Sequence, residues 1–436
     1  MPQINYFVYY RSCKYTDQPY RFQLLFHYLV VSINNKESLG DTVKETKFSG
    51  NQSYLKELNL MSSLRIIRSK GLISRAELAD TLGLNRSTIT AVVHQLMEKN
   101  FVIEVGTGNS KGGRPPLLLQ FNADYAYAAS LEWTAEHVRL YITDLKGQIR
   151  CTRSLPYYPD RAPRPQVEQA IETLKSAYAE LPKKTPSLLG IVIGVPGIVD
   201  RHNVISYDLG WDEMPLADDF ASAFECPVIV ENSAHIGLTA ERYFGNGLGE
   251  ANLGYIRINR GVQAGVLYED RIYRGNEGFV GNIGHLVVDR KGRKCICGNR
   301  GCLQTYISEQ ALLNSYGSYA GEREDVDMAK LIQRVRENEA GAIRAVHEFA
   351  DYLGTGVGNL INLMNPGAVV IDSALAEIGD TIGSVLFNRI LRTALPYPRR
   401  NVRILFSNLG EQAIPLGAAA ILLDHVFAPP QVTAIS

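Results

Sequence analysis

The segment GFVGNIGHLVVDRKGRKCICGNRGCLQ, residues 278–304, concentrates metal-binding side chains. Three of the chain's six cysteines, Cys295, Cys297 and Cys302, lie within eight residues, and His285 stands ten residues before the first of them. Zinc takes thiolate and imidazole ligands in a tetrahedral set of four, and a shell of three cysteines and one histidine is a closed structural site. The sequence therefore predicts a structural Zn²⁺ site.

A simpler interpretation of the same residues is that the cysteines are small buried side chains and the histidine is a satisfied core residue. Gly298 and Gly301 favour zinc, because glycine lets the loop fold back until three sulfurs reach one ion. A disulfide is disfavoured, because nothing in the chain suggests secretion.

The spacing of Gly-His and Cys-x-Cys-Gly-x-x-Gly-Cys resembles the zinc signature of the ROK family, which unites repressors, open reading frames and sugar kinases. The resemblance extends over about residues 50–427. It implies two actin-like ATPase lobes with a sugar in the cleft between them, and a zinc loop that holds ligand-binding residues in place. Kinase and repressor are then the two branches to distinguish.

The length of 436 residues indicates two or three domains. Hydrophobic content of 45% is typical of a globular protein, and the net charge of zero restricts any nucleic-acid surface to one part of the chain. No apolar run is long enough for a membrane span, so we expect a cytoplasmic protein. We expect three parts: an extension without an assigned role (1–49), a winged helix-turn-helix domain (50–121) and a sensor domain whose last helix returns to the first lobe (122–436).

The N-terminal domain carries the pattern of a helix-turn-helix. Residues 54–69 place apolar side chains three to four apart, as one face of a helix does. Ser74 is an expected N-cap, and Glu77 completes a capping box. Gly83 supplies a turn, and a second helix is expected from residue 85 or 86 to about 99.

The second helix of this motif enters the major groove with its N-terminal part. Short polar side chains and one arginine stand there, suited to phosphates and base edges. Two strands and a basic tip, GTGNSKGGRPP, predict a wing that places arginine in the minor groove. The candidate DNA-binding residues are Ser74, Asn85, Arg86, Ser87, Thr88, Thr90, His94, Lys111 and Arg114.

A local charge excess supports this interpretation. Residues 51–120 hold nine Lys or Arg against five Asp or Glu, a net charge of +4 in a neutral chain. A helical hairpin used for protein contact is the alternative. The segment LGLNRST also resembles the xylose-repressor branch of the ROK family, and ROK kinases lack such a module.

The C-terminal part alternates strands with helices, which predicts an α/β domain with binding residues at the carboxyl ends of strands. Strands are expected at 126–131, 138–143, 148–154, 188–194, 228–231 and 369–372, and helices at 166–181, 234–244, 353–364 and from 415.

Three departures from the kinase pattern predict an inactive domain, by comparison with the family that the chain resembles. The kinases' Asp-x-Gly-Gly-Thr phosphate motif corresponds to residues 132–136, EWTAE, where Trp133 and an added carboxylate are expected to obstruct and repel phosphates. Arg260 replaces a threonine in the second glycine loop. The kinases' catalytic Asp corresponds to Ser233, whose hydroxyl does not take a proton unaided at neutral pH.

The resemblance also implies a sugar site, with the candidate residues Gly197, Asn232, Ser233, Asn282, His285 and Gln304. Two family glutamates correspond to the amides Asn282 and Gln304, which still donate and accept hydrogen bonds but lose the charge-assisted ones. An acidic or phosphorylated ligand held by Arg257 and Arg260 is one hypothesis. The alternative is that both arginines pair with surface acids.

The sequence thus predicts a zinc-containing repressor of carbohydrate-utilisation genes, similar to the xylose repressors, that binds double-stranded operator DNA and a sugar or sugar derivative. A palindromic operator needs two modules, so a homodimer or dimer of dimers is expected. Sugar binding is expected to shift the lobes and reorient the modules. The alternatives are an ATP-dependent sugar kinase with an appended domain and a regulator that responds to a protein partner.

Overall fold

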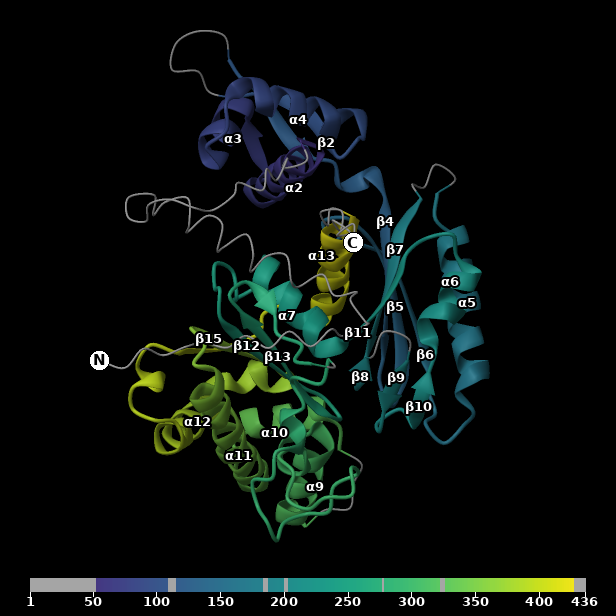
Figure 1. Cartoon of the computed structure of the whole chain (residues 1–436). Helices are drawn as coiled ribbons and strands as arrows, with labels where there is room; N and C mark the ends of the chain where they lie inside the picture. The colour runs from purple at the N-terminus through teal and green to yellow at the C-terminus, as the bar shows by residue number, and fades with distance from the viewer. Residues whose placement is uncertain are drawn as a thin grey trace, which may run out of the picture.

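The computed structural model describes residues 52–108, 115–182, 187–199, 203–276, 278–321 and 326–426 (Figure 1). The expected extension 1–49 lies outside these ranges, as do Lys111 and Arg114 at the expected wing tip. Within the described ranges, no helix combines the length and the apolar character that crossing a membrane requires.

The N-terminal module is a winged helix-turn-helix, as predicted. Its elements are α2 (Gln52–Lys70), β1 (Leu72–Ser74), α3 (Arg75–Leu82), α4 (Arg86–Glu98), β2 (Val102–Thr107) and β3 (Leu117–Phe121). The strands pair antiparallel in the order β1-β3-β2. Both bonds of the capping box between Ser74 and Glu77 are present, and Gly83 ends α3 in the left-handed conformation with φ 63°.

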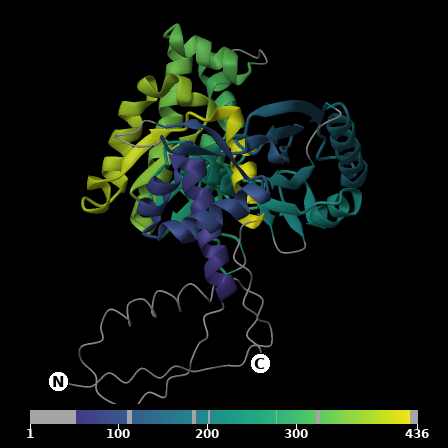
Figure 2. The same ribbon diagram turned by 90° about the horizontal axis from the view of Figure 1, so that it is seen from above.

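The core of the module forms where its three helices meet the sheet. Ile67, Leu78, Ile89 and Leu96 are all 0% exposed. Leu55, which the sequence pattern places on the buried face of α2, is 49% exposed. The buried face of α2 starts only at Leu60, because the first turns of the helix extend past the rest of the module (Figure 2).

The first lobe is built on a five-stranded sheet in the order β11-β7-β4-β5-β6. Its elements are β4 (Tyr127–Trp133), β5 (His137–Asp144), β6 (Ile149–Pro156), α5 (Pro163–Ala179), β7 (Leu188–Val195), β8 (Ile198–Val199), β9 (Val204–Ser206), β10 (Trp211–Met214), α6 (Leu216–Ala223) and β11 (Val228–Asn232). The strands β4, β7 and β11 run parallel. Helices α5 and α6 cover one face, and β8, β9 and β10 form a small sheet beside it.

The second lobe is built on a sheet in the order β14-β13-β12-β15-β16. Its elements are β12 (Leu253–Ile258), β13 (Val262–Tyr268), β14 (Arg271–Ile272), α8 (Gln304–Ile307), α9 (Glu309–Ala320), α10 (Met328–Arg336), α11 (Ala340–Met364), β15 (Ala368–Asp372), α12 (Gly379–Thr393) and β16 (Arg403–Phe406). Helices α8 to α12 pack over one face around a large apolar core. The segment that carries the four predicted metal ligands, residues 278–303, lies between β14 and α8 and is called the zinc loop after the sequence-based prediction.

Two helices, α7 (Ser233–Phe244) and α13 (Ala413–Val426), lie between the two sheets (Figure 1). Ala234 and Leu238 of α7 pack on the sheet of the second lobe. Ile236 of α7 packs with α13, which in turn lies on β4 and β7 of the first lobe. Gly417 permits this close approach, because a Cβ there would lie 2.1 Å from the carbonyl oxygen of Ile236.

The DNA-binding module sits above the middle of the body, between the two lobes (Figure 2). Its helix α2 rests on the ends of α7 and α13. The guanidinium of Arg68 stacks on the rings of Tyr243, at 4.9 Å, and Phe244, at 5.5 Å. The hydroxyl of Tyr243 donates to Oδ2 of Asp424 at 2.8 Å, and Arg65 pairs with Oδ1 of the same carboxylate at 3.4 Å. The module is therefore joined to both central helices.

Candidate functional site

The four candidate metal ligands come together in the structure. The ligand atoms of His285, Cys295, Cys297 and Cys302 all lie within 4.8 Å of one another. Nδ1 of His285 is 3.7 Å from Sγ of Cys295, and the Sγ atoms of Cys297 and Cys302 are 3.7 Å apart. Three sulfurs and one imidazole at these separations fit tetrahedral zinc, which takes such donors at about 2.0–2.3 Å.

The loop reaches this geometry by folding back on itself. The amide of Gly301 donates to the carbonyl of Arg293 at 2.7 Å, and the amide of Cys295 donates to the carbonyl of Asn299 at 2.8 Å. Gly301 has φ 71°, and a Cβ there would lie only 1.5 Å from the carbonyl oxygen of Asp289. Glycine is therefore required at Gly301 by both conformation and space.

Two further features tune the cluster. Nε2 of Gln304 donates to Sγ of Cys295 at 3.4 Å, so this hydrogen bond helps to orient the cysteine side chain. Burial, together with the neighbouring sulfurs of Cys295 and Cys297, raises the pKa of Cys302 to about 12. A metal must displace that proton in order to bind.

The predicted sugar-binding residues of the first lobe lie next to one another. The side chain of Asn232 caps α7 by accepting from the amide of Ala234 at 2.8 Å, and its Nδ2 donates to the carbonyl of Gly197 at 2.6 Å. Ser233 is 3% exposed, and within the described part of the chain no hydrogen-bond partner reaches its Oγ. The structure thus brings Gly197, Asn232 and Ser233 together at the start of α7.

An ionic cluster stands beside them. The carboxylate of Glu231 contacts Nδ1 of His235 at 2.9 Å and Nη2 of Arg274 at 2.5 Å. Burial opposes the charge of Glu231, but His235 and Arg274 outweigh it and lower the pKa of Glu231 to about 2. Arg274 comes from the chain just before the zinc loop, so the cluster joins α7 to that loop.

The second-lobe members of the predicted set lie nearer the zinc loop. Nδ2 of Asn282 donates to the carbonyl of Phe279 at 3.0 Å. The imidazole of His285 stands edge-on to the ring of Tyr207, with centroids 6.4 Å apart. Burial lowers the pKa of His285, although Asp208 partly offsets that effect. Gln304 is the only one of the six predicted sugar-site residues that lines the large cavity between the lobes.

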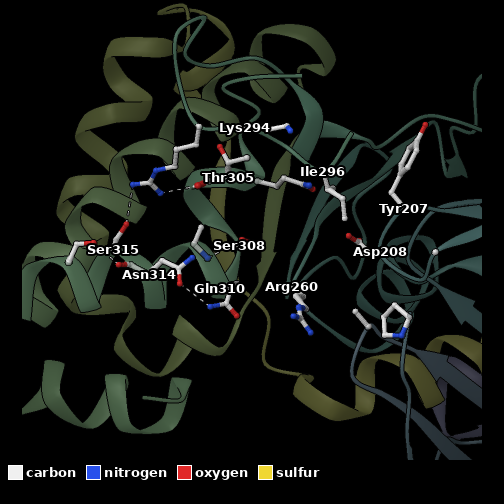
Figure 3. A pocket seen from close by; sticks show the side chains of 17 residues that line it. Tyr207, Asp208, Arg260, Lys294, Ile296, Thr305, Ser308, Gln310, Asn314 and Ser315 are labelled. Carbon is white, nitrogen blue, oxygen red and sulfur yellow. Dashed lines mark hydrogen bonds between the residues drawn. The ribbon is translucent and has the colours of Figure 1, made fainter. Parts of the chain in front are cut away.

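That cavity has a volume of about 830 Å³ (Figure 3). Its first-lobe wall includes Tyr207 and Asp208, from the segment between β9 and β10. Its second-lobe wall is formed by the zinc loop near Lys294 and Ile296, and by the face of α9 that carries Asn314 (Figure 3). A concave site of this size between two lobes suits a small polar molecule.

Sequence reasoning missed Asp208, a carboxylate at the junction of this cavity with a smaller one. Burial raises the pKa of Asp208, while His285 and Arg260 partly offset that effect. A Cβ on Gly261 would lie 2.6 Å from Oδ2 of Asp208, so the glycine makes room for the carboxylate. Asp208 supplies the cleft with a carboxylate from the first lobe. The two family glutamates that Asn282 and Gln304 replace would have come from the second lobe.

An arginine bridges the lobes at the floor of the cleft. Nη2 of Arg257 lies 2.5 Å from Oε1 of Glu132 in the first lobe, and Nη1 lies 2.6 Å from Oδ2 of Asp372 in the second. Tyr255 also donates to Asp372, at 2.6 Å. Burial alone would lower the pKa of Arg257, but Glu132 and Asp372 outweigh it and raise the pKa well above its usual value. The adjoining cavity holds only about 40 Å³.

This arrangement changes two expectations from the sequence. Trp133 does not project into the cleft as an obstruction; its indole packs into the first-lobe core against Trp211 and Phe220, because successive strand residues point to opposite faces. The side chain that occupies the floor of the cleft, beside the small cavity, is Arg257. Arg260 pairs with Glu136 of the first lobe at 3.1 Å, so both arginines have carboxylate partners across the cleft.

The expected DNA-reading face is exposed at the start of α4. Asn85 caps the helix, and its Oδ1 accepts from the amide of Thr88 and from Oγ of Ser87, both at 2.7 Å. Arg86 and Thr90 project from the exposed side, and His94 lies two turns further along, 3.5 Å from Glu98. Ser74 is 5% exposed, and its hydroxyl is used in the capping box, so it positions the motif from within.

A winged helix-turn-helix joined to a two-lobed, sugar-kinase-like body with a Cys3His loop defines the class of protein. The ROK family model matches residues 128–425, and the MarR family model matches residues 57–103. The chain belongs to the ROK family.

Among its relatives is the xylose repressor of Bacillus spizizenii, 31% identical over 376 residues that cover 86% of this chain and 97% of the relative. The DNA-binding transcriptional dual regulator NagC of Escherichia coli is 25% identical over 383 residues, which cover 86% of this chain and 94% of NagC. Both relatives are matched along nearly their whole length, which includes the N-terminal module.

Solved structures share the fold. A ROK family transcriptional regulator described as a homologue of the E. coli MLC protein has a TM-score of 0.74, at 23% identity, over 86% of this chain and 98% of that one. A ROK glucokinase from Streptomyces griseus, solved with glucose and AMPPNP, has a TM-score of 0.60, at 22% identity, over 68% of this chain and 99% of that one. Both structures are matched along nearly their whole length, but the regulator covers 86% of this chain and the kinase only 68%.

Proposed function

We propose that this protein is a transcriptional repressor that binds operator DNA through its winged helix-turn-helix and releases it when a sugar binds between the lobes. The observation that carries the proposal is the joining of the two parts through α7. This helix begins with Ser233 at the small cavity that adjoins the cleft, and it ends against α2 with Tyr243 and Phe244. A change in lobe angle is thereby transmitted to the DNA-binding module.

The DNA contacts are assigned to α4 and the wing. Asn85, Arg86, Ser87, Thr88 and Thr90 lie in the first turns of the helix that enters the major groove in such modules. His94 would reach the groove edge, and Lys111 and Arg114 would contact the phosphates or the minor groove. Two modules would be needed for a palindromic site, so the acting species is a homodimer or dimer of dimers working on cytoplasmic DNA.

Zinc is assigned a structural part. His285, Cys295, Cys297 and Cys302 would hold one Zn²⁺ in a closed shell, which supplies no reaction but fixes the loop that leads from the sugar site to α8. Gln304 lines the cleft and donates to Cys295 of this loop, so metal and sugar binding would support each other.

The body acts as a sensor without kinase activity. The buried Arg257 stands where a phosphate chain would need space, and the cavity beside it, about 40 Å³, has room for only a few water molecules. Ser233 stands in place of the catalytic base. The alternative, a kinase with an appended module, requires the ion pair to open and a different base to act.

The proposal is tested by selecting genomic DNA fragments that bind the zinc-loaded protein, then titrating the complex with pentoses and hexoses while following fluorescence anisotropy. Sugar-dependent release, with no ADP formed from ATP and the same sugars, is the expected result. Selective DNA binding that no sugar alters would overturn the sensor part, and ADP formation would favour the kinase.

A further inference from the structure

The groove between the lobes is longer than one sugar ring requires. Its volume of about 830 Å³ lies in the upper part of the usual range for small-molecule sites, roughly 300–1,000 Å³. It runs from Tyr207 and Asp208 past the zinc loop to Ser318 on α9 (Figure 3). The α9 wall alone, from Gln310 to Ser318, is about 12 Å long at a rise of 1.5 Å per residue.

The α9 wall consists of neutral hydrogen-bonding groups. Gln310, Asn314 and Ser318 are spaced four apart, so they lie on one face of the helix, and all three are exposed. Nε2 of Gln310 donates to Oδ1 of Asn314 at 3.0 Å. Ala311 and Ser315 between them are small and buried, which leaves the wall open. Amides and hydroxyls both donate and accept, as sugar hydroxyls do.

Two of the three cations that line the groove are paired with carboxylates. Arg260 pairs with Glu136 at 3.1 Å, and Arg293 pairs with Glu348 at 3.1 Å. Neither of these carboxylates is a lining residue, whereas Lys294 and Asp208 both line the groove. The ion pairs weaken the attraction of Arg260 and Arg293 for an anionic ligand.

The opposite wall presents an aromatic ring. Tyr207 is 58% exposed at the rim of the cavity, next to Asp208. The face of a tyrosine ring is apolar and slightly negative, which suits the C–H face of a sugar ring. Asp208 offers an acceptor for charge-assisted bonds from hydroxyls. One sugar ring between these residues and Gln304 would leave the α9 wall, on the far side, without a ligand.

We propose that this groove binds a neutral oligosaccharide, with its first ring against Tyr207, Asp208 and Gln304 and its further rings along Gln310, Asn314 and Ser318 of α9. The inference rests on the proposed function as a sugar-responsive regulator and names the class of its effector. A phosphorylated monosaccharide, the alternative that the cleft arginines first suggested, is disfavoured because Arg257 and Arg260 are already paired with carboxylates.

The test is calorimetric titration of the full-length, zinc-loaded protein with two matched series, xylose, xylobiose and xylotriose, and glucose, cellobiose and cellotriose, and with glucose 6-phosphate. In one series we expect the trisaccharide to bind at least about ten-fold more tightly than its monosaccharide, as one to two extra hydrogen bonds allow. Equal affinity along both series, or tighter binding of the phosphate, overturns the inference.

The double variant Gln310→Ala/Asn314→Ala tests the position of the further rings. Both side chains are exposed, and alanine favours helix, so α9 is retained. We expect trisaccharide affinity to fall about ten-fold while monosaccharide affinity stays unchanged. The matched control is Gln333→Ala, an exposed amide on α10 outside the groove, which should change neither. An unchanged trisaccharide affinity in the double variant contradicts the assignment to α9.

Different results would overturn the oligosaccharide inference and the proposed sugar-responsive repressor. A monosaccharide that releases DNA as well as its longer homologues would overturn the oligosaccharide inference and leave the sugar-responsive repressor intact. If no saccharide binds while DNA binding persists, both the inference and the sugar-sensing part of the proposed function are wrong.

Discussion

Nη2 of Arg257 lies 2.5 Å from Oε1 of Glu132, and this pair joins the two lobes across the floor of the cleft. The side chains are 12% and 6% exposed, so water screens the pair weakly. Asp372 holds the other end of the guanidinium at 2.6 Å. Replacing one member of such a buried set leaves an uncompensated charge, which is costly.

Removal of Arg257 should therefore destabilise the protein strongly. We expect Arg257→Ala to lower the free energy of unfolding by about 3–5 kcal/mol, because Glu132 and Asp372 are left buried without a cation. Urea unfolding followed by circular dichroism measures the change. Combining Arg257→Ala with Glu132→Gln and Asp372→Asn should recover part of the loss, since the buried negative charges are then removed.

Arg260→Ala is the matched control. Its pair with Glu136 also crosses the cleft, but the two side chains are 50% and 65% exposed. An exposed pair contributes about 0–1 kcal/mol. If Arg257→Ala costs no more than Arg260→Ala, the buried ion pair does not hold the lobes as we describe.

Zinc should be present at one ion per chain and should be lost on substitution of its ligands. We expect Cys302→Ser to abolish stoichiometric zinc, measured by elemental analysis, and to lower the melting temperature. Because the metal-free Cys302 thiol has a pKa raised to about 12, apparent zinc affinity should rise with pH over the neutral range.

Cys226→Ser supplies the control for the zinc prediction, since Cys226 lies in the first lobe away from the cluster. It should retain zinc and respond to a chelator as the wild type does. Full zinc occupancy in Cys302→Ser would show that the four residues do not form the metal site.

The DNA-reading role of α4 predicts a selective effect of Arg86→Ala. Loss of a base-edge contact should weaken binding to a selected DNA fragment by about 1–3 kcal/mol and relax its sequence preference. Lys56→Ala, an exposed cation on α2 outside α4, should change affinity little. Anisotropy titrations at two salt concentrations check this, and equal effects of the two variants would argue against α4 as the reading helix.

The contact between α2 and α7 should carry the sugar signal. Arg68 stacks on Tyr243 and Phe244, and burial lowers the pKa of Arg68, although Asp424 and Tyr243 partly offset that effect. Arg68→Met keeps much of the apolar packing but removes the cation, worth about 0.5–2 kcal/mol. In this variant we expect DNA affinity without sugar to stay nearly unchanged. We expect the sugar-induced release of DNA to be lost.

Arg65→Met is the matched control for coupling, because its pair with Asp424 is long, at 3.4 Å, and its side chain is 57% exposed. It should release DNA as the wild type does. Normal sugar-induced release in Arg68→Met would place the transmission elsewhere.

Local patterns in the sequence were sufficient for the features that are local in the structure. The capping box of Ser74 and Glu77 and the turn at Gly83 fix the helix-turn-helix within ten residues. The spacing of Cys295, Cys297 and Cys302 brings the sulfurs together because the loop is short and rich in glycine. These features depend on neighbouring residues, which the sequence shows directly.

The cleft floor could not be predicted in the same way. Arg257 and Glu132 are 125 residues apart and lie in different sheets, so no spacing connects them. Asp208 lies in an irregular segment without periodicity. The side of β4 to which Trp133 points depends on which face of the sheet receives α5 and α6, and that is settled by the tertiary packing.

Sugar binding between the lobes should release DNA from the winged helix. Fluorescence anisotropy of a selected DNA fragment bound to the zinc-loaded protein, titrated with mono- and oligosaccharides, measures this release. We expect release at sugar concentrations that match the calorimetric Kd, and loss of release without loss of DNA binding in Arg68→Met. DNA binding that stays constant while the same sugar saturates the protein would contradict it.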